Sequence, residues 1–85
     1  MKEFNYVITD PEGIHARPAG LLVKEANKFT SKVEIGKDGK FADAKRIFGV
    51  MGLGAKKGNE ITIKAEGEDE VQAAEALEAF LKENL

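Results

Sequence analysis

His15 is the only histidine in the chain, and it lies within the segment GIHARPAG, residues 13–20. Arg17 and Pro18 follow it closely, where an apolar helical pattern begins. A helix N-terminus carries unpaired amide protons and a partial positive charge, which together attract an anion such as phosphate. The same positive potential favours the neutral imidazole, which is nucleophilic. Because arginine supplies planar donors for phosphoryl oxygens, the arrangement predicts a histidine that accepts a phosphoryl group.

A purely structural role for His15 is the alternative. Helix termini leave backbone groups without partners, and an imidazole nitrogen at a helix start can accept one of these amide protons. The spacing of the residues alone does not separate this capping role from phosphoryl chemistry.

The sequence lacks the motifs with which a protein takes a phosphoryl group from a nucleotide unaided. It has no GxxxxGK[ST] loop, no second histidine and no carboxylate cluster typical of a metal–nucleotide site. Cysteine is also absent, and a single histidine cannot build a histidine-rich metal site. We therefore expect no metal and no cofactor, and a phosphoryl carrier that depends on a partner protein rather than a stand-alone catalyst.

Composition and charge exclude several classes of protein. The 85 residues, 42% hydrophobic and 33% charged, are typical of one globular domain, expected to span residues 1–85. A net charge of -2 gives no general attraction to nucleic acid or to an anionic membrane. No apolar run is long enough to span a bilayer, and the N-terminus has no signal-peptide core. We therefore expect a cytoplasmic protein without nucleic-acid binding or membrane insertion.

Apolar periodicity predicts the elements that position His15. Alternation at Phe4, Tyr6 and Ile8 predicts a first strand. A helix is expected over residues 16–28, with Pro18 in its first turn, where the missing N–H costs least. Its apolar face, marked by three- and four-residue steps, consists of Ala19, Leu22, Val23 and Ala26.

The rest of the chain alternates between strand and helix patterns. A strand in SKVEIG, residues 31–36, precedes the Asp38-Gly39 pair favoured in type I′ hairpins, and a return strand begins at Phe41. Residues 47–54 are rich in glycine, so only packing could hold a short helix there. A strand follows at 60–66, and then a helix with Asp69 and Gln72 spaced as a capping box. The apolar face of that helix is predicted to be Val71, Ala74, Leu77 and Leu81.

The predicted order βαββαβα favours an α+β fold, an antiparallel sheet covered on one face by helices. On this reading GIHARPAG and the later segment AKRIFGVMGLGAKKG resemble motifs of the phosphocarrier HPr family of the bacterial phosphoenolpyruvate:sugar phosphotransferase system. The resemblance covers essentially the whole chain. It implies an open-faced β-sandwich, a four-stranded antiparallel sheet with three helices on one side.

The same resemblance implies a reaction and its partners. Enzyme I, which uses phosphoenolpyruvate, would phosphorylate His15 on Nδ1, and the group would pass to the IIA units of sugar permeases. Arg17 matches the arginine that contacts the phosphate, which is expected to bind at Ala16 and Arg17. A phosphoryl-imidazole suits a carrier because neutral imidazole is a competent nucleophile and a good leaving group once protonated.

A partner surface is implied on the first two helices, and a monomer is expected. The residues of this partner surface are expected to be Gly20, Lys24, Ile47, Phe48 and Met51, although Ile47 could equally belong to the core. Phe48 and Met51 fit a surface that meets several proteins, because aromatic and soft side chains suit that use. Lys28, four residues after Lys24, could be simply solvated.

The chain departs from low-GC Gram-positive members of the family at Arg46, where they carry a regulatory serine, and at Gly20 and Gly52. Regulation through Arg46 is therefore not expected. One alternative is a regulatory binding module of the same fold, but such members replace the active histidine. A second is a ferredoxin-like binder of RNA or a small ligand, which would need stacking aromatics that residues 60–66 lack.

Overall fold

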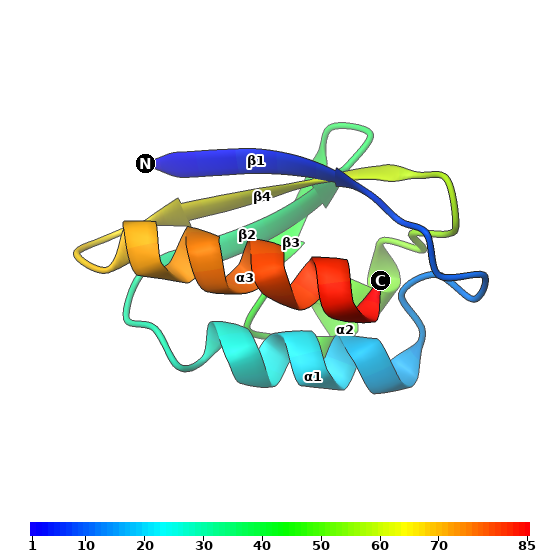
Figure 1. The fold of residues 1–85 in the computed structure, drawn as a ribbon, viewed down its shortest axis with the longest axis horizontal. Helices are drawn as coiled ribbons and strands as arrows, with labels where there is room; N and C mark the ends of the chain where they lie inside the picture. Colours follow the sequence, from blue (N-terminus) through cyan, green and yellow to red (C-terminus); the bar gives the residue numbers. More distant parts are fainter.

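Seven elements follow one another in a computed structural model that describes residues 1–85 (Figure 1). They are β1 (Lys2–Val7), α1 (Ala16–Ala26), β2 (Lys32–Lys37), β3 (Lys40–Asp43), α2 (Ile47–Gly52), β4 (Glu60–Glu66) and α3 (Glu70–Asn84). The order matches the predicted βαββαβα pattern, and β4 has the predicted bounds. None of the helices has the length and apolar character needed to cross a membrane.

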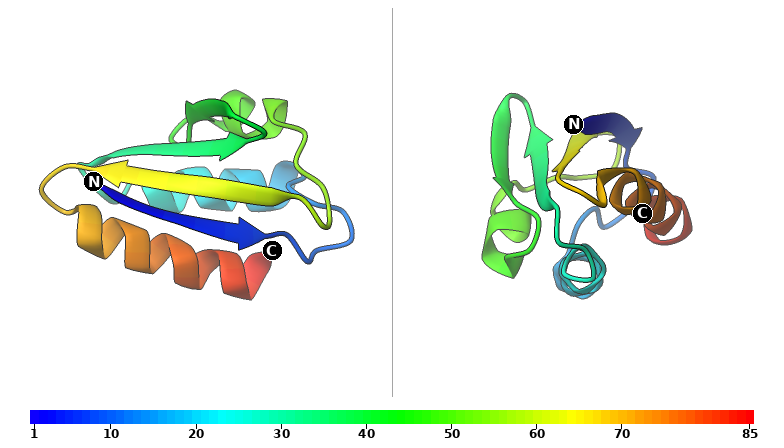
Figure 2. Two further views of the ribbon diagram at one scale, coloured as in Figure 1. Left: turned by 90° about the horizontal axis from the view of Figure 1, so that it is seen from above. Right: turned by 90° about the vertical axis from the view of Figure 1, so that its left-hand side faces the viewer.

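The four strands form one sheet in the order β1-β4-β2-β3, and every neighbouring pair is antiparallel. β4 therefore lies between β1 and β2, while β3 forms an edge (Figure 2). All three helices lie on the same face of the sheet, and its other face is open (Figure 2). The expected fold class, an α+β open-faced sandwich, is confirmed.

The core lies between the sheet and the helices. Because side chains alternate along a strand, β4 turns Ile61, Ile63 and Ala65 inward, and all three are fully buried. Leu22 of α1 and Leu77 of α3 are also fully buried within the same apolar cluster. This packing fixes α1 on the sheet, and with it the position of His15 at the start of the helix.

The apolar face of α3 differs from the prediction. The helix buries Ala73, Leu77 and Leu81, whereas Val71 is 45% exposed. Ala73 and Ala74 fit a helical repeat equally well in an alanine-rich segment, so the sequence does not determine which one faces the core. Packing selects Ala73, and this turns Val71 toward solvent.

Asp69 makes no capping hydrogen bond to α3, so the predicted capping box with Gln72 is wrong. Its carboxylate instead accepts hydrogen bonds from the backbone N–H groups of Thr30 and Ser31, at 2.9 Å each, and from the Ser31 hydroxyl. The hydroxyl, followed by the Thr30 amide, lowers the pKa of Asp69 from its ordinary value of 3.8 to about 2. The carboxylate thus joins the loop after α1 to the loop before α3.

The turns and helix ends follow local chemistry. Asp38 and Gly39, which join β2 to β3, have φ values of +53° and +82°, as the predicted type I′ turn requires. α1 ends at Ala26, two residues before its predicted end, and the side-chain amide of Asn27 donates to the Val23 carbonyl at 2.9 Å. Lys28 therefore lies beyond the helix.

α2 is short, and packing holds it in place as predicted. Val50 is its buried residue. At Gly49 a Cβ atom would lie 3.3 Å from the Cβ of Ala42 and 3.4 Å from the carbonyl oxygen of Asp43, both in β3. Glycine thus allows a close approach of α2 to the edge strand, which offsets its low helix propensity.

Candidate functional site

The loop before α1 is anchored on the loop before β4. Gly13 has a φ of +68°, and a Cβ atom there would lie 2.4 Å from the carbonyl oxygen of Ala55, so a larger residue would displace the loop. The N–H of buried Ile14 donates to the same carbonyl at 3.0 Å. His15 follows as the N-cap residue of α1, with extended backbone angles of φ -91° and ψ -176°. The contacts of Gly13 and Ile14 therefore fix the backbone position from which the His15 side chain projects.

The imidazole does not cap α1. His15 makes no side-chain hydrogen bond to the first turn, so the purely capping role is wrong. The first helical bond is donated by the N–H of Ala19 to the His15 carbonyl at 3.0 Å, and Pro18 has no N–H. The N–H groups of Ala16 and Arg17 have no protein acceptor. Two unpaired donors therefore lie next to the imidazole, where an anion can bind.

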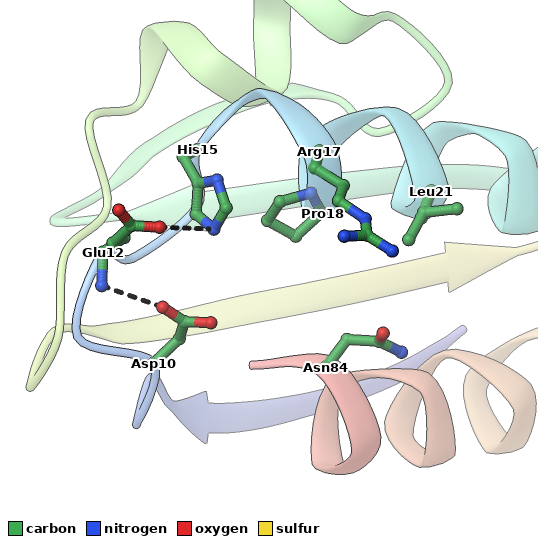
Figure 3. A pocket seen from close by; sticks show the side chains of 7 residues that line it. All are labelled: Asp10, Glu12, His15, Arg17, Pro18, Leu21 and Asn84. Atoms are coloured by element: carbon green, nitrogen blue, oxygen red, sulfur yellow. Dashed lines mark hydrogen bonds and ion pairs between the residues drawn. The ribbon is translucent and has the colours of Figure 1, made fainter.

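The His15 side chain lines a pocket of about 310 Å³ (Figure 3). Three segments form it: the loop after β1, the start of α1 and the last turn of α3. The lining residues are Asp10, Glu12, His15, Arg17, Pro18, Leu21 and Asn84. His15 and Arg17, predicted from the sequence to share a site, thus line one pocket.

Arg17 is an unpaired cation in this pocket. Its side chain is exposed and takes part in none of the ion pairs or side-chain hydrogen bonds of the structure. In Figure 3 its guanidinium lies beyond Pro18 from the imidazole, so the two groups do not touch. A long side chain with no other partner is free to turn toward an anion bound at His15. Its contact with phosphate stays a prediction.

Two carboxylates that the sequence did not assign to the site also line the pocket. Asp10 Oδ1 accepts the backbone N–H of Glu12 at 2.8 Å, and Glu12 Oε2 lies 3.5 Å from His15 Nε2 (Figure 3). The Asp-Pro-Glu-Gly segment is typical of such a turn, since Asp side chains bind the backbone two residues on. The direction of Glu12 depends on how this turn meets α1, for which the sequence carries no signal.

Asp10, Glu12 and His15 could each offer one atom to a metal ion, because these atoms lie within 4.8 Å of one another. Exposed acidic groups often gather in this way without an ion, so the cluster alone does not assign a metal. The expectation of a metal-free site stays a prediction.

An apolar surface, formed by Ile47, Phe48 and Met51 of α2, lies beside α1. These side chains are 37%, 86% and 38% exposed, so the alternative of a core position for Ile47 is wrong. Ile47, Phe48 and Met51 are called the α2 patch below. A Cβ atom at Gly20 of α1 would lie 3.8 Å from Cδ1 of Ile47, which places this glycine at the edge of the α2 patch.

The lysines of α1 differ from each other. Lys24 is exposed, forms no ion pair and lies four residues after Gly20, on the same helix face. Lys28 donates to Glu25 at 3.0 Å and is past the end of the helix. Of these two lysines, only Lys24 therefore offers a free charge, on the face of α1 that carries Gly20.

A family model described as "PTS HPr component phosphorylation site" matches residues 2–83. The chain belongs to the HPr family. It is 49% identical over 83 residues to "Phosphocarrier protein HPr" of Lysinibacillus sphaericus, with 98% of this chain and 94% of the relative covered. It is 51% identical over 73 residues to "HPr-like protein Crh" of Bacillus subtilis (strain 168), with 86% of each covered.

Solved structures agree with this assignment. A histidine-containing phosphocarrier protein of Mycoplasma superposes with a TM-score of 0.93 at 43% identity, over 96% of this chain and 93% of its own. An HPr dimer from Thermoanaerobacter tengcongensis has a TM-score of 0.78 at 43% identity, over 98% and 95% of the two chains. Homology thus makes the chain a relative of the phosphocarriers of the phosphotransferase system. Since a solved HPr is described as a dimer, the expected monomer stays a prediction.

Arg46, where a regulatory serine is expected in Gram-positive relatives, lies at the start of α2. Arg46 is the N-cap residue and makes no capping hydrogen bond to α2. Its Nε lies 3.7 Å from Asp43 Oδ2, while Asp43 Oδ1 accepts the Lys45 N–H at 2.9 Å. Asp43 thus places a carboxylate beside a cation that the helix dipole alone would disfavour.

Proposed function

We propose that this chain is a phosphocarrier, which accepts a phosphoryl group on His15 from phosphorylated Enzyme I and passes it to IIA units in carbohydrate uptake. The observation that carries the proposal is the position of the sole imidazole, at the N-cap of α1 beside unpaired amides and the unpaired Arg17. The imidazole is the nucleophile, the amides of Ala16 and Arg17 bind phosphoryl oxygens, and the guanidinium opposes their developing charge.

The carrier needs partners for both halves of its reaction, and the α2 patch with Gly20 and Lys24 supplies the surface for them. Phe48 is 86% exposed and belongs to a patch with exposed Ile47 and Met51, and exposed apolar patches mark interaction sites. A free lysine at its border suits an acidic partner surface. This function places the chain in the cytoplasm, acting as one domain of residues 1–85 without metal or cofactor.

The test is to incubate the protein with phosphoenolpyruvate and Enzyme I and to look for an acid-labile phosphate adduct. The parent should gain one phosphoryl group. His15→Ala should fold as the parent does, since the imidazole is partly exposed and makes no capping bond, yet take no label. Undiminished labelling of His15→Ala would end the carrier proposal.

A regulatory binding module is the second candidate, because Crh is 51% identical to this chain. A module of that kind docks on partners and carries no phosphate. The presence of both His15 and Arg17 in one pocket supports the carrier over this candidate. Binding of Enzyme I or IIA without any label on His15 would favour the module.

A further inference from the structure

Glu12 is the charged group that pairs with the His15 ring. Its Oε2 lies 3.5 Å from Nε2, while the other ring nitrogen has no hydrogen-bond partner. The other charged groups that line the pocket are Asp10 and the unpaired Arg17. A carboxylate oxygen of Asp10 lies within 4.8 Å of a ring nitrogen, but Asp10 forms no ion pair with the ring and accepts the backbone N–H of Glu12. Asn84 of α3 is uncharged. In Figure 3 the ring turns Nε2 toward Glu12 and Nδ1 toward the start of α1.

We propose that Glu12 is a positioning residue, which keeps the imidazole proton on Nε2 and so leaves the lone pair of Nδ1 free to accept the phosphoryl group. This inference rests on the proposed function and adds the residue that selects the reacting nitrogen. At 3.5 Å the pair is longer than a hydrogen bond, but a carboxylate attracts an N–H dipole and repels a lone pair, so its position favours the tautomer with N–H at Nε2. Neutral imidazole has one N–H, and Nδ1 then carries the lone pair.

The position of Glu12 is fixed by its neighbours on both sides. The Glu12 N–H donates to Asp10 Oδ1 at 2.8 Å, and Gly13 packs so closely on the Ala55 carbonyl that a Cβ atom there would lie 2.4 Å from its oxygen. The glutamate therefore has a defined backbone position three residues before His15, although its side chain is exposed. In Figure 3 Nδ1 points toward the ribbon at the start of α1, the turn whose Ala16 and Arg17 amides have no protein acceptor. Glu12 and the amides thus act on opposite sides of one ring.

The phosphoryl step balances with the proton kept in place. The Nδ1 lone pair forms the N–P bond while the bond from phosphorus to the donor breaks, and that electron pair stays with the donor. The ring becomes a phosphoryl-imidazolium with its proton on Nε2, and the Glu12 carboxylate opposes its positive charge. When the group moves on, a nucleophile of the acceptor protein forms the new bond to phosphorus, the P–N pair returns to Nδ1, and neutral imidazole leaves with the proton still on Nε2.

The tautomer can be measured without any reaction, by ¹⁵N NMR of histidine-labelled protein at a pH where the ring is neutral. The parent should favour N–H at Nε2. In Glu12→Gln the ratio of the two tautomers should fall about two- to fivefold, the size of a weak, exposed electrostatic contact. The amide can also donate to Nε2, which favours the opposite tautomer. Glu12→Asp, which keeps a carboxylate, should retain part of the parent ratio.

Glu68→Gln is the matched control, because it removes the same charge from an exposed residue in the loop before α3, whereas Asn84 at the other end of α3 lines the pocket. It should leave the ratio unchanged. A second readout is the single-turnover rate of phosphorylation by phosphorylated Enzyme I, expected to fall about two- to fivefold in Glu12→Gln only.

Three outcomes decide the proposal. A parent-like tautomer ratio in Glu12→Gln overturns it, even if the parent is phosphorylated normally. A changed ratio with a parent-like transfer rate also overturns it, because the position of the proton would then have no consequence for transfer. If the parent takes no phosphoryl group, the carrier function fails, and an unchanged ratio would overturn the positioning role independently.

Discussion

The hydroxyl of Ser31 donates a hydrogen bond to the carboxylate of Asp69, 38 residues further along the chain. Ser31 is 1% exposed, and a Cβ atom at Gly67 would lie 2.6 Å from its hydroxyl oxygen. Glycine at position 67, with a φ of +152°, therefore allows the loop before α3 to approach the loop after α1. The contact ties α1 to α3 at the end of the molecule away from His15.

Asp69 should make stability fall at low pH. Its folded-state pKa of about 2 is below the ordinary value of 3.8, so the ionised carboxylate stabilises the fold above pH 3.8. That contribution is lost as the pH falls from 3.8 through about 2. Thermal unfolding followed by circular dichroism should show a steeper loss in this window for the parent than for Asp69→Asn.

The control is Asp38→Asn, since Asp38 lies exposed in the β2–β3 turn and asparagine tolerates its positive φ. This variant should keep the pH dependence of the parent. Glu70 also has a lowered pKa, caused first by its hydrogen bond with the N-terminal amine, but it is retained in both variants. Equal curves for the parent and Asp69→Asn would contradict the role of Asp69.

Gly13→Ala should both destabilise the protein and slow phosphorylation. The new Cβ would meet the Ala55 carbonyl oxygen at 2.4 Å, and φ is +68°. The substitution should therefore lower the free energy of unfolding by on the order of 1–3 kcal/mol. Urea denaturation measures this loss. Gly39→Ala, also at a positive φ but with no atom within 4 Å, isolates the cost of φ from that of the contact. Equal losses in the two variants would mean that the Ala55 contact is not limiting.

Arg17→Ala should fold normally and transfer phosphate slowly. The side chain is exposed and unpaired, so its loss removes no contact of the fold. Removing a contact made mainly in the transition state should slow transfer by about 10²-fold or more in single-turnover kinetics. Arg17→Lys should also be impaired, because a point charge cannot reproduce two parallel donors. A parent-like rate in Arg17→Ala would show that the guanidinium does not act on the phosphate.

Phe48→Asp should weaken binding to both Enzyme I and IIA units while melting near the parent temperature. The ring is 86% exposed, so the fold loses little when it is replaced. Isothermal titration calorimetry with each partner measures the effect. Val71→Asp, which charges an exposed apolar residue of α3 outside the α2 patch, should bind as the parent does. A large fall in melting temperature for Phe48→Asp would assign the ring to the core instead.

Arg46 should make the chain resistant to an HPr serine kinase. Arginine has no hydroxyl, and Ser31, the single serine of the chain, is 1% exposed and bound to Asp69. Incubation with the kinase and ATP should label Arg46→Ser only. Equal labelling of the parent would contradict the prediction. Arg46 also adds a cation beside the α2 patch, which should favour an acidic partner surface.

Strict alternation made the strands predictable, and alanine made α3 ambiguous. Residues 60–66 alternate without exception, and the structure has β4 at these bounds. The face of α3 was predicted in part: Leu77 and Leu81 are buried as expected, whereas Val71 is exposed and Ala73 takes the place of Ala74, because neighbouring alanines leave the helix phase to packing. Asp69 looked like a cap because local spacing cannot show that Ser31, far along the chain, competes for its carboxylate.

The chemistry of the site was readable from residue types, and its geometry was not. His15 and Arg17 stand out because each suits phosphate at a helix start. Glu12 did not stand out, since a glutamate in a turn is usually solvated. The direction of the Glu12 side chain depends on the contact of the loop before α1 with Ala55, which lies 43 positions after Glu12. Tertiary contacts of this kind leave no periodic signal.

The face of the sheet that no helix covers gives this chain a natural place for a spectroscopic label. Glu3 of β1 is exposed and lies opposite Lys64, on a strand whose Phe4 and Tyr6 pack toward the core. Because the chain has no cysteine, a Glu3→Cys variant would carry a single thiol for a fluorophore. The dye would lie on the opposite side of the sheet from the helices, so it could report docking by a change in rotational diffusion without blocking the contact.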